Sequence, residues 1–218
     1  MASQSAVDNL FSSNAQWAQA VTQADPDFFI NSAKGQSPQT LWIGCADSRA
    51  PESVITASKP GDIFVHRNIA NQFHSDDTSV LAVLDYAVNF LGVKHVAIVG
   101  HGECGGAAAC LGAAQRDDFN PDAPITLPML PKEAPLNRWL GSLSRVAHKL
   151  VKSHEASISR VVEENVKLQV ENLCKAETIV NAWTKGTPKG QEVYVHGWVY
   201  DLASGRLQDL KITRGKTA

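Results

Sequence analysis

The sequence predicts an α/β protein whose core is a parallel β-sheet. Three nearly continuous apolar runs, at 40–44, 62–66 and 94–100, have the length of buried strands. Apolar residues with helical spacing over 79–91 separate the second run from the third, and a good helix first turn at Pro51 follows the first run. Strands that alternate with helices in this way indicate parallel pairing.

The N-terminal segment has a different character from the runs that follow it. Residues 8–32 show helical spacing of apolar residues, although Pro26 must interrupt or restart the helix. We therefore expect an N-terminal helical arm over 1–35 that docks elsewhere. A single α/β domain would then occupy 36–218.

After the third run the chain predicts an irregular loop, two helices and a hairpin. Five prolines fall within 116–135 and exclude a long regular element there. Helical spacing resumes over 136–152 and 158–185. The segments 192–200 and 206–212 flank a short glycine-containing turn and predict a hairpin. The expected fold is thus a parallel sheet with flanking helices and an added C-terminal strand.

Composition narrows the class of protein. The 218 residues suit one globular domain, and a formal net charge of -2 argues against nucleic acid as a partner. The apolar runs end far short of the roughly 20 residues that cross a bilayer, so we expect no membrane association. The first twenty residues contain no Lys or Arg, unlike a signal or transit peptide, and we expect a cytoplasmic protein.

Three potential metal ligands follow the predicted strands. Cys45 follows the first strand, His101 follows the third, and Cys104 comes three residues later in a glycine-rich loop. Carboxyl ends of parallel strands meet at one edge of a sheet, so these side chains can converge on one ion. Two thiolates and an imidazole suit zinc, and three ligands leave one position open, as in catalytic sites. Taken alone, the two cysteines could equally be buried thiols of the core.

Longer motifs around these residues resemble a known family. Cys45-Ala-Asp-Ser-Arg49, followed by His101-Gly-Glu-Cys104, resembles the pattern of the β-class carbonic anhydrases. Two further segments are similar to the family: 61–71 and 196–201. The likeness covers nearly the whole chain, and the fungal and bacterial members look nearest.

The resemblance implies a zinc enzyme, a lyase that interconverts carbon dioxide and bicarbonate. Its single Zn²⁺ per chain would be held by Cys45, His101 and Cys104. Zinc-bound hydroxide would hydrate carbon dioxide reversibly to bicarbonate and a proton. Asp47 and Arg49 would form the catalytic dyad, and Asp47 would become a fourth zinc ligand only in a closed state.

The same resemblance implies substrate contacts and an assembly. Gln36 matches a substrate-binding glutamine, and Phe64 matches an apolar residue that lines the carbon dioxide pocket. Members of the family are homodimers with active sites at the subunit interface, and their N-terminal helices wrap the partner. Pairs of dimers frequently form tetramers, which we expect here as well.

Members with a regulatory switch resemble this chain at Trp42, Arg67 and Tyr200. In those members the three residues bind a non-catalytic bicarbonate that favours the inactive form. An indole N–H, a guanidinium and a phenol do supply donors for a small anion. The alternative readings are a core Trp, an Arg paired with a carboxylate, and a buried Tyr. Ala50 is smaller than the valine common in the family at this position, which changes the shape of the expected pocket.

Charge at the site predicts how activity depends on pH. Two thiolates neutralise the ion, so bound water should be less acidic than at a site with three imidazoles. We therefore expect activity to rise between about pH 7 and 9. Two alternative functions stay open: hydrolysis of carbon disulfide or carbonyl sulfide, and bicarbonate-responsive regulation with low turnover. The intact pair of Asp47 and Arg49 argues against the second.

Other histidines and cysteines are assigned structural roles. His66, His74 and His95 lie in or beside apolar runs, and we interpret them as structural histidines. Cys110 and Cys174 lack a partner motif and are expected to be buried thiols.

Overall fold

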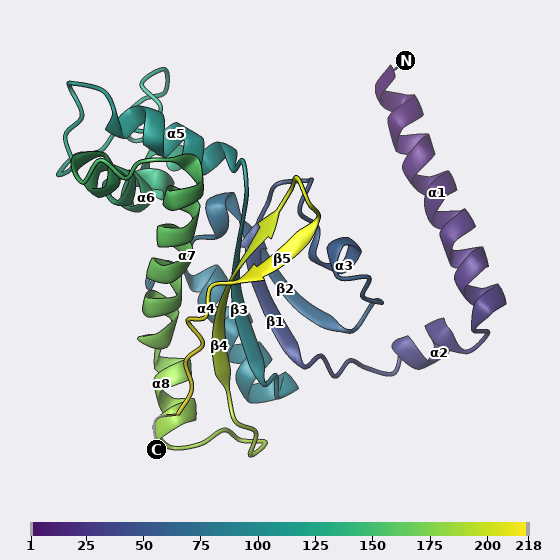
Figure 1. Ribbon diagram of the computed structural model, residues 1–218. Helices are drawn as coiled ribbons and strands as arrows, with labels where there is room; N and C mark the ends of the chain where they lie inside the picture. The colour runs from purple at the N-terminus through teal and green to yellow at the C-terminus, as the bar shows by residue number, and fades with distance from the viewer. Residues whose placement is uncertain (1, 217–218) are drawn as a thin grey trace. The chain divides into compact units, whose positions relative to one another are not determined.

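One five-stranded sheet organises the larger part of the molecule (Figure 1). The computed structural model describes residues 2–216, with side chains from residue 5 onward. The strands are β1 (Thr40–Cys45), β2 (Ile63–Asn68), β3 (His95–His101), β4 (Tyr194–Asp201) and β5 (Arg206–Asp209). Their order is β2-β1-β3-β4-β5; the first four in sequence run parallel, whereas β5 pairs antiparallel with β4. The predicted parallel sheet, hairpin and added C-terminal strand are confirmed.

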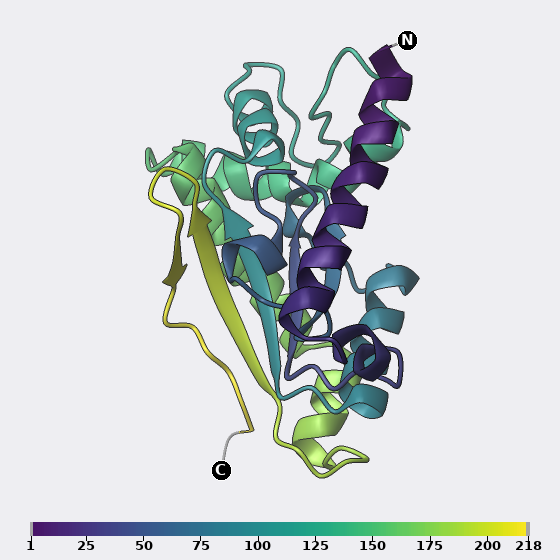
Figure 2. The same cartoon turned by 90° about the vertical axis from the view of Figure 1, so that its right-hand side faces the viewer.

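Helices precede the first strand and connect consecutive strands as far as β4. They are α1 (Ala2–Ala24), α2 (Phe28–Ser32), α3 (Glu52–Ile55), η1 (Ile69–Asn71), α4 (Thr78–Asp85), η2 (Tyr86–Leu91), α5 (Gly105–Ala114), α6 (Pro135–Lys152), α7 (Ile158–Cys174) and α8 (Glu177–Thr184). Helix α7 packs against β3 and β4, while α5 and α6 pack against each other (Figures 1 and 2). Helix α5 begins directly after Cys104, and the proline-rich stretch before α6 is irregular, as expected.

One expectation about the helices was wrong. The segment 158–185 forms two helices, because the chain leaves the helical conformation at Ala176, where φ is -63° and ψ is 137°. No glycine or proline marks this break in the sequence. Ala176 and Ile179 are buried in the core, so tertiary packing of α8 decides the break.

The two faces of the sheet carry different cores. Alternate residues of a strand point to opposite faces, and registered residues of parallel neighbours share a face. On one face Leu41, Ile43 and their registered neighbours join the main core with α5, α6 and α7. On the other face Trp42, Ala97 and Val99 form a smaller cluster.

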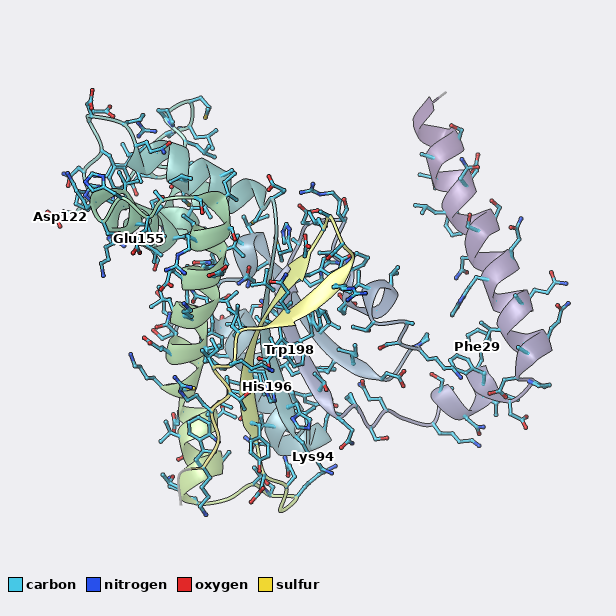
Figure 3. All side chains as sticks on the ribbon, in the orientation of Figure 1. Phe29, Lys94, Asp122, Glu155, His196 and Trp198 are labelled. Atoms are coloured by element: carbon cyan, nitrogen blue, oxygen red, sulfur yellow. The ribbon has the colours of Figure 1, made fainter. Side chains whose placement is uncertain are left out.

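The chain divides into two compact units, Met1–Gln36 and Ser37–Ala218. In the first, α1 and α2 are joined at a turn where Phe29 packs edge-on against Trp17, with ring centroids 5.6 Å apart (Figure 3). Leu10 and Phe11 of α1 are 72% and 73% exposed. Within the part of the chain that the structure describes, no helix has the length and apolar character that a membrane span requires.

Candidate metal centre

Three soft ligands meet at the carboxyl edge of the sheet. Cys45 ends β1 and His101 ends β3, and these strands are parallel neighbours. The loop after β3 turns back at Glu103, whose φ is 51°, and returns Cys104 to the same edge. The two sulfurs and an imidazole nitrogen lie within 4.8 Å of one another, and all three residues are buried. The geometry therefore brings the three predicted ligands together.

The imidazole of His101 is oriented so that it can bind a cation. Its Nδ1 lies 2.7 Å from the Gly102 carbonyl oxygen, which only accepts, so Nδ1 carries the proton and donates it. Nε2 is then an acceptor, and it is buried without a hydrogen-bond partner among the described residues. A backbone carbonyl that fixes the tautomer is typical of metal-binding histidines. Two sulfurs and this nitrogen make a donor set that fits zinc.

The two cysteine thiols are unequal. A hydrogen bond from Cys104 lowers the pKa of Cys45 to about 4, with smaller contributions from the backbone N–H groups of Asp47 and Ala70, and against the effect of burial. That hydrogen bond to Cys45, together with burial, raises the pKa of Cys104. Cys45 therefore has more thiolate character than Cys104. A cation bound at this position would replace the shared proton.

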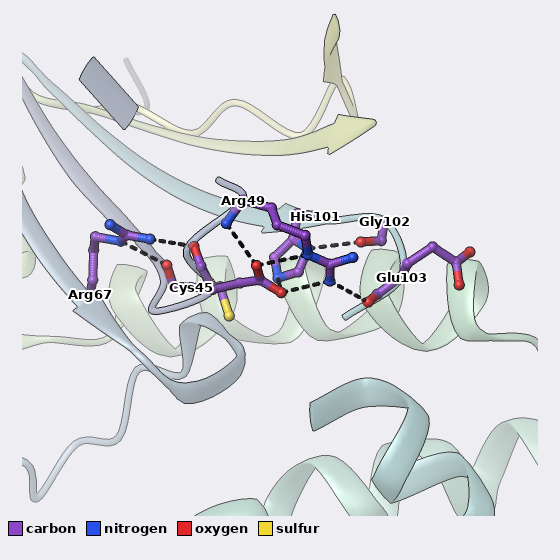
Figure 4. A network of polar contacts seen from close by, with 7 residues as sticks. Cys45, Arg49, Arg67, His101, Gly102 and Glu103 are labelled. Carbon is purple, nitrogen blue, oxygen red and sulfur yellow. Dashed lines mark hydrogen bonds and ion pairs between the residues drawn. The ribbon is translucent and has the colours of Figure 1, made fainter. Parts of the chain in front are cut away.

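Asp47 and Arg49 form a two-pronged ion pair beside the ligands (Figure 4). Arg49 Nε and Nη2 donate to Asp47 Oδ1 and Oδ2 at 3.0 and 2.7 Å. Nη2 also donates to the Glu103 carbonyl at 3.1 Å, which ties the loop after β1 to the loop after β3. The guanidinium holds the pKa of Asp47 well below its usual range. An ionised carboxylate oxygen therefore lies 3.7 Å from His101 Nε2.

Arg67 holds the same loop from the other side (Figure 4). Its Nε donates to the Cys45 carbonyl at 2.8 Å and its Nη2 to the Asp47 carbonyl at 2.6 Å. Glu52 lies 3.9 Å from Nε, at the limit of an ion pair. No local motif indicates these backbone contacts, because they join positions about twenty residues apart through pairing of β1 with β2.

Trp42, Arg67 and Tyr200 lie on one face of the sheet. Arg67 is registered with Gly44, two residues after Trp42 on β1, and Tyr200 is registered with His101. The indole Nε1 of Trp42 occupies the space that a Cβ at Gly44 would need. This nitrogen therefore lies over Gly44, the residue that is registered with Arg67. The smaller cluster of this face also contains Trp198, whose side chain Figure 3 shows next to His196.

The two expected substrate residues lie elsewhere. Gln36 is exposed and ends the first unit, so its role stays a prediction. Phe64 is registered with Leu41, four residues before Cys45, which is about 13 Å along the strand. Its ring faces Tyr86 of η2, with centroids 5.9 Å apart. Phe64 is therefore remote from the ligands of its own chain.

The remaining histidines and cysteines have structural surroundings. His66 and His74 are partly buried, and burial lowers the pKa of each. His95 Nδ1 lies 3.1 Å from His196 Nε2. Cys110 is fully buried, which raises its pKa to about 11, as expected of a core thiol. Cys174 is only partly buried, so that expectation holds less completely.

The fold and this site together define a class: open α/β sheets with a metal centre at the carboxyl edge. The family model described as carbonic anhydrase matches residues 40–207. Carbonic anhydrase of Emericella nidulans is 37% identical, over 94% of this chain and 83% of that protein. The chain belongs to the carbonic anhydrase family.

Solved structures place the chain within the β class of that family. One solved structure belongs to a pair described as tetrameric β-carbonic anhydrases from the filamentous ascomycete Sordaria macrospora. Its sequence is 35% identical to this chain. The match has a TM-score of 0.80 and covers 96% of this chain and 98% of that one. The β-carbonic anhydrase of Coccomyxa, solved in complex with acetazolamide, is 30% identical to this chain. The match has a TM-score of 0.79 and covers 94% of this chain and 86% of that one. Both likenesses extend over nearly the whole chain.

Proposed function

We propose that this chain hydrates carbon dioxide reversibly to bicarbonate and a proton at a zinc centre. The observation that carries the proposal is the convergence of Cys45, His101 and Cys104 within 4.8 Å beside an ionised Asp47. Membership in the carbonic anhydrase family favours this activity over the two alternatives considered from the sequence. Zinc held by the three ligands, one per chain, would supply the Lewis acid that turns water into a nucleophile near neutral pH.

Asp47 orients the attacking water in this proposal. Its Oδ2 lies beside the ligand cluster and accepts a hydrogen bond from the water, which directs a lone pair toward carbon dioxide. Arg49 keeps the pKa of Asp47 low, so the carboxylate is a weak base that does not retain the proton. The proton passes to buffer. If Arg49 released it, the carboxylate would be near enough to move toward the ligands and close the site.

Stopped-flow hydration of carbon dioxide at pH 7 and 8.5 tests this function. The protein must have a measured zinc content, so that turnover is expressed per zinc. We expect fast turnover that is higher at pH 8.5 and disappears when the zinc is removed. One zinc per chain without turnover at either pH would contradict the proposed activity. A flat profile would contradict the expected alkaline activation alone.

Regulation by a second bicarbonate is part of the proposal. Trp42, Arg67 and Tyr200 share a face, and Arg67 donates to the Asp47 carbonyl. An anion that draws the guanidinium away would loosen the loop that carries Asp47. Tyr200→Phe removes one donor and leaves Arg67 in place. We expect weaker and less cooperative inhibition by bicarbonate at unchanged zinc content; inhibition identical to wild type would exclude this role.

We also propose an assembly in which a second copy completes the site. The Sordaria macrospora relatives are described as tetrameric, and a homodimer paired into a tetramer is proposed here. Phe64, Tyr86 and Phe90 form a row with ring centroids 5.9 and 5.6 Å apart, and Phe90 is 62% exposed. Because Phe64 is remote from its own ligands, it would line the carbon dioxide pocket of the partner.

The first unit fits the same assembly. The exposed apolar residues of α1 suit an arm, proposed over 1–35, that packs on another copy. Residues 36–218 are proposed to form the catalytic domain. Gln36 is proposed to contact substrate, as the resemblance of the sequence implies. Light scattering of the wild type and of Phe90→Glu tests the assembly: we expect dimers or tetramers for the wild type and dissociation in the variant. The cytoplasmic location stays a prediction, which fractionation of cells would test.

A further inference from the structure

A polar cavity lies where the chain after η1 meets the helices α6 and α7. Its volume is about 440 Å³. That size falls in the range of small-molecule sites, which is about 300 to 1,000 Å³. None of the residues that line it belongs to the ligand cluster of Cys45, His101 and Cys104 or to the pair of Asp47 and Arg49. The cavity is therefore separate from the candidate metal centre.

Helical spacing brings polar side chains of two helices to this cavity. On α6, Arg138, Ser142 and Arg145 follow one another at intervals of four and three residues, so they share one face of the helix. At the end of α7, Asn172 and Lys175 are three residues apart. The two helices pack against each other, and both sets of side chains line the same cavity.

The chain at 73–76 forms a third wall, which contacts both helices. Asn172 Nδ2 of α7 donates to the Phe73 carbonyl at 3.4 Å. His74 packs on Trp139 of α6, with ring centroids 4.4 Å apart. The three walls are thus anchored to one another, and the cavity is formed before any ligand binds, as is usual for small-molecule sites.

The cations that line the cavity have no carboxylate partner among the described residues. Within that part of the chain, the side chains of Arg138 and Lys175 make neither a hydrogen bond nor an ion pair. Arg145 uses only its Nε, which donates to the Pro121 carbonyl at 2.9 Å. A guanidinium has five N–H donors, so most donors of both arginines are available to a ligand. Asp76 is the one carboxylate among the lining residues, so the cavity has an excess of positive charge.

A neighbouring cavity between the same helices has a different balance of charge. Lys149 and Lys167 line it together with Glu164 and Glu171. Lys167 donates to Glu164 at 2.7 Å, so carboxylates offset the cations there. The whole chain has a formal net charge of -2. The excess of cations in the first cavity is therefore a local feature and does not follow from a basic protein.

We propose that this cationic cavity binds a small molecule that carries two or more phosphate groups. The planar guanidinium of an arginine matches phosphate oxygens and can bind them with two parallel hydrogen bonds. Lys175 adds a point charge from the other helix, and Ser142 adds a hydroxyl donor between the two arginines. Cations on opposite walls suit more than one phosphate group. The inference does not rest on the proposed function, because it uses no residue of the metal centre.

Isothermal titration calorimetry with pyrophosphate tests the proposal on the zinc-loaded protein. Chloride is kept at about 0.1 M, so that exposed charges more than about 10 Å apart are largely screened. We expect saturable binding of one pyrophosphate per chain, and weaker binding of inorganic phosphate under the same conditions. Zinc content is measured before and after the titration, because pyrophosphate can also bind metal ions.

Two double variants locate the binding. Arg138→Gln with Lys175→Gln, the cavity variant, should bind pyrophosphate about 10-fold or more weakly, since charge-assisted hydrogen bonds are lost. Lys149→Gln with Lys152→Gln, the control variant, removes the same charge from α6 outside the cavity and should stay within about twofold of wild type. All four side chains are exposed, so both variants should keep the unfolding midpoint of the wild type. Arg138→Gln alone is a milder variant if the cavity variant loses stability.

A local NMR signal reports the place of binding. The indole N–H of Trp139 donates to the Ile69 carbonyl at 2.8 Å, and His74 of the cavity wall packs on the same indole. This resonance should move with pyrophosphate in the wild type and in the control variant, and stay in place in the cavity variant. Its absence from spectra of Trp139→Phe identifies it.

Three results would overturn the proposal. They are binding that does not saturate, equal affinity of the wild type and the cavity variant for pyrophosphate, and equal affinity of the wild type for pyrophosphate and inorganic phosphate. None of these readouts depends on turnover. A protein that binds pyrophosphate in the cavity but lacks hydration activity would contradict the proposed function and leave this inference intact.

Discussion

The loops after β1 and β2 are joined where the Ala46 N–H donates to the Asn68 carbonyl at 2.8 Å, yet they are built differently. In the first, Arg49 bonds to Asp47 two residues away, so the ion pair is contained in one short motif. In the second, the Ala70 carbonyl bonds to Asn165, 95 residues away on α7. A local motif can be read from the sequence, whereas a backbone group held by a distant helix cannot. Both kinds of contact hold loops that follow strands at the carboxyl edge of the sheet.

The largest effect should come from removing a ligand next to the first loop. Cys104→Ala takes one of the three converging donors away, and two donors alone should not retain zinc. We expect less than about a tenth of the wild-type zinc content after dialysis, and hydration near the uncatalysed rate. Metal analysis and stopped-flow hydration on the same preparation measure both.

A matched cysteine makes this prediction specific. Cys110 is fully buried but bonds to the Leu140 carbonyl in the core, away from the ligand cluster. Cys110→Ala should keep one zinc per chain and nearly full activity, with at most a modest loss of stability of about 1 kcal/mol. Retention of zinc by Cys104→Ala, or its loss in Cys110→Ala, would show that the ligand set is wrong.

The next effect concerns the orienting carboxylate of the first loop. Asp47→Asn keeps the shape and the hydrogen bond from the Arg49 N–H but removes the charge. We expect kcat/KM to fall by about 100-fold or more, since positioned proton acceptors contribute about 10²- to 10⁴-fold. Zinc content should stay at one per chain because Asp47 is outside the ligand cluster. Activity within threefold of wild type would remove Asp47 from the mechanism.

The same contrast explains what the sequence predicted. Strand positions followed from apolar runs, because a strand covered on both faces needs continuous apolar residues. The three candidate ligands and the pair of Asp47 and Arg49 could be picked out because they lie in two short motifs, at 45–49 and 101–104. The contacts of Arg67 with the loop, the break at Ala176 and the hydrogen bond from Asn165 to the Ala70 carbonyl could not. Each depends on strand pairing or helix packing, which no local pattern records.

The smallest effect belongs to the far end of the second loop. His74 stacks on Trp139, with ring centroids 4.4 Å apart, and its buried Nε2 has no partner among the described residues. Burial lowers the pKa of His74, although Asp76 and Asp77 oppose the shift. The unfolded chain, with an ordinary pKa of about 6.5, then binds a proton that the folded chain does not. Stability should therefore fall as pH drops through that value.

His74→Phe keeps the stacked ring and removes this proton. At pH 7.5 the unfolding midpoint should differ little from wild type, by about 2 °C or less. Between pH 7.5 and 5.5 the wild type should lose about 1 to 2 °C more than the variant, because His66 and His196 contribute equally to both. Thermal unfolding at fixed protein and zinc concentration measures the difference. Parallel pH profiles would mean that His74 takes up a proton as readily in the folded chain as in the unfolded one. The second loop would then be more open at His74 than its burial indicates, and the contrast with the first loop would apply only near Ala70, where Asn165 holds the backbone.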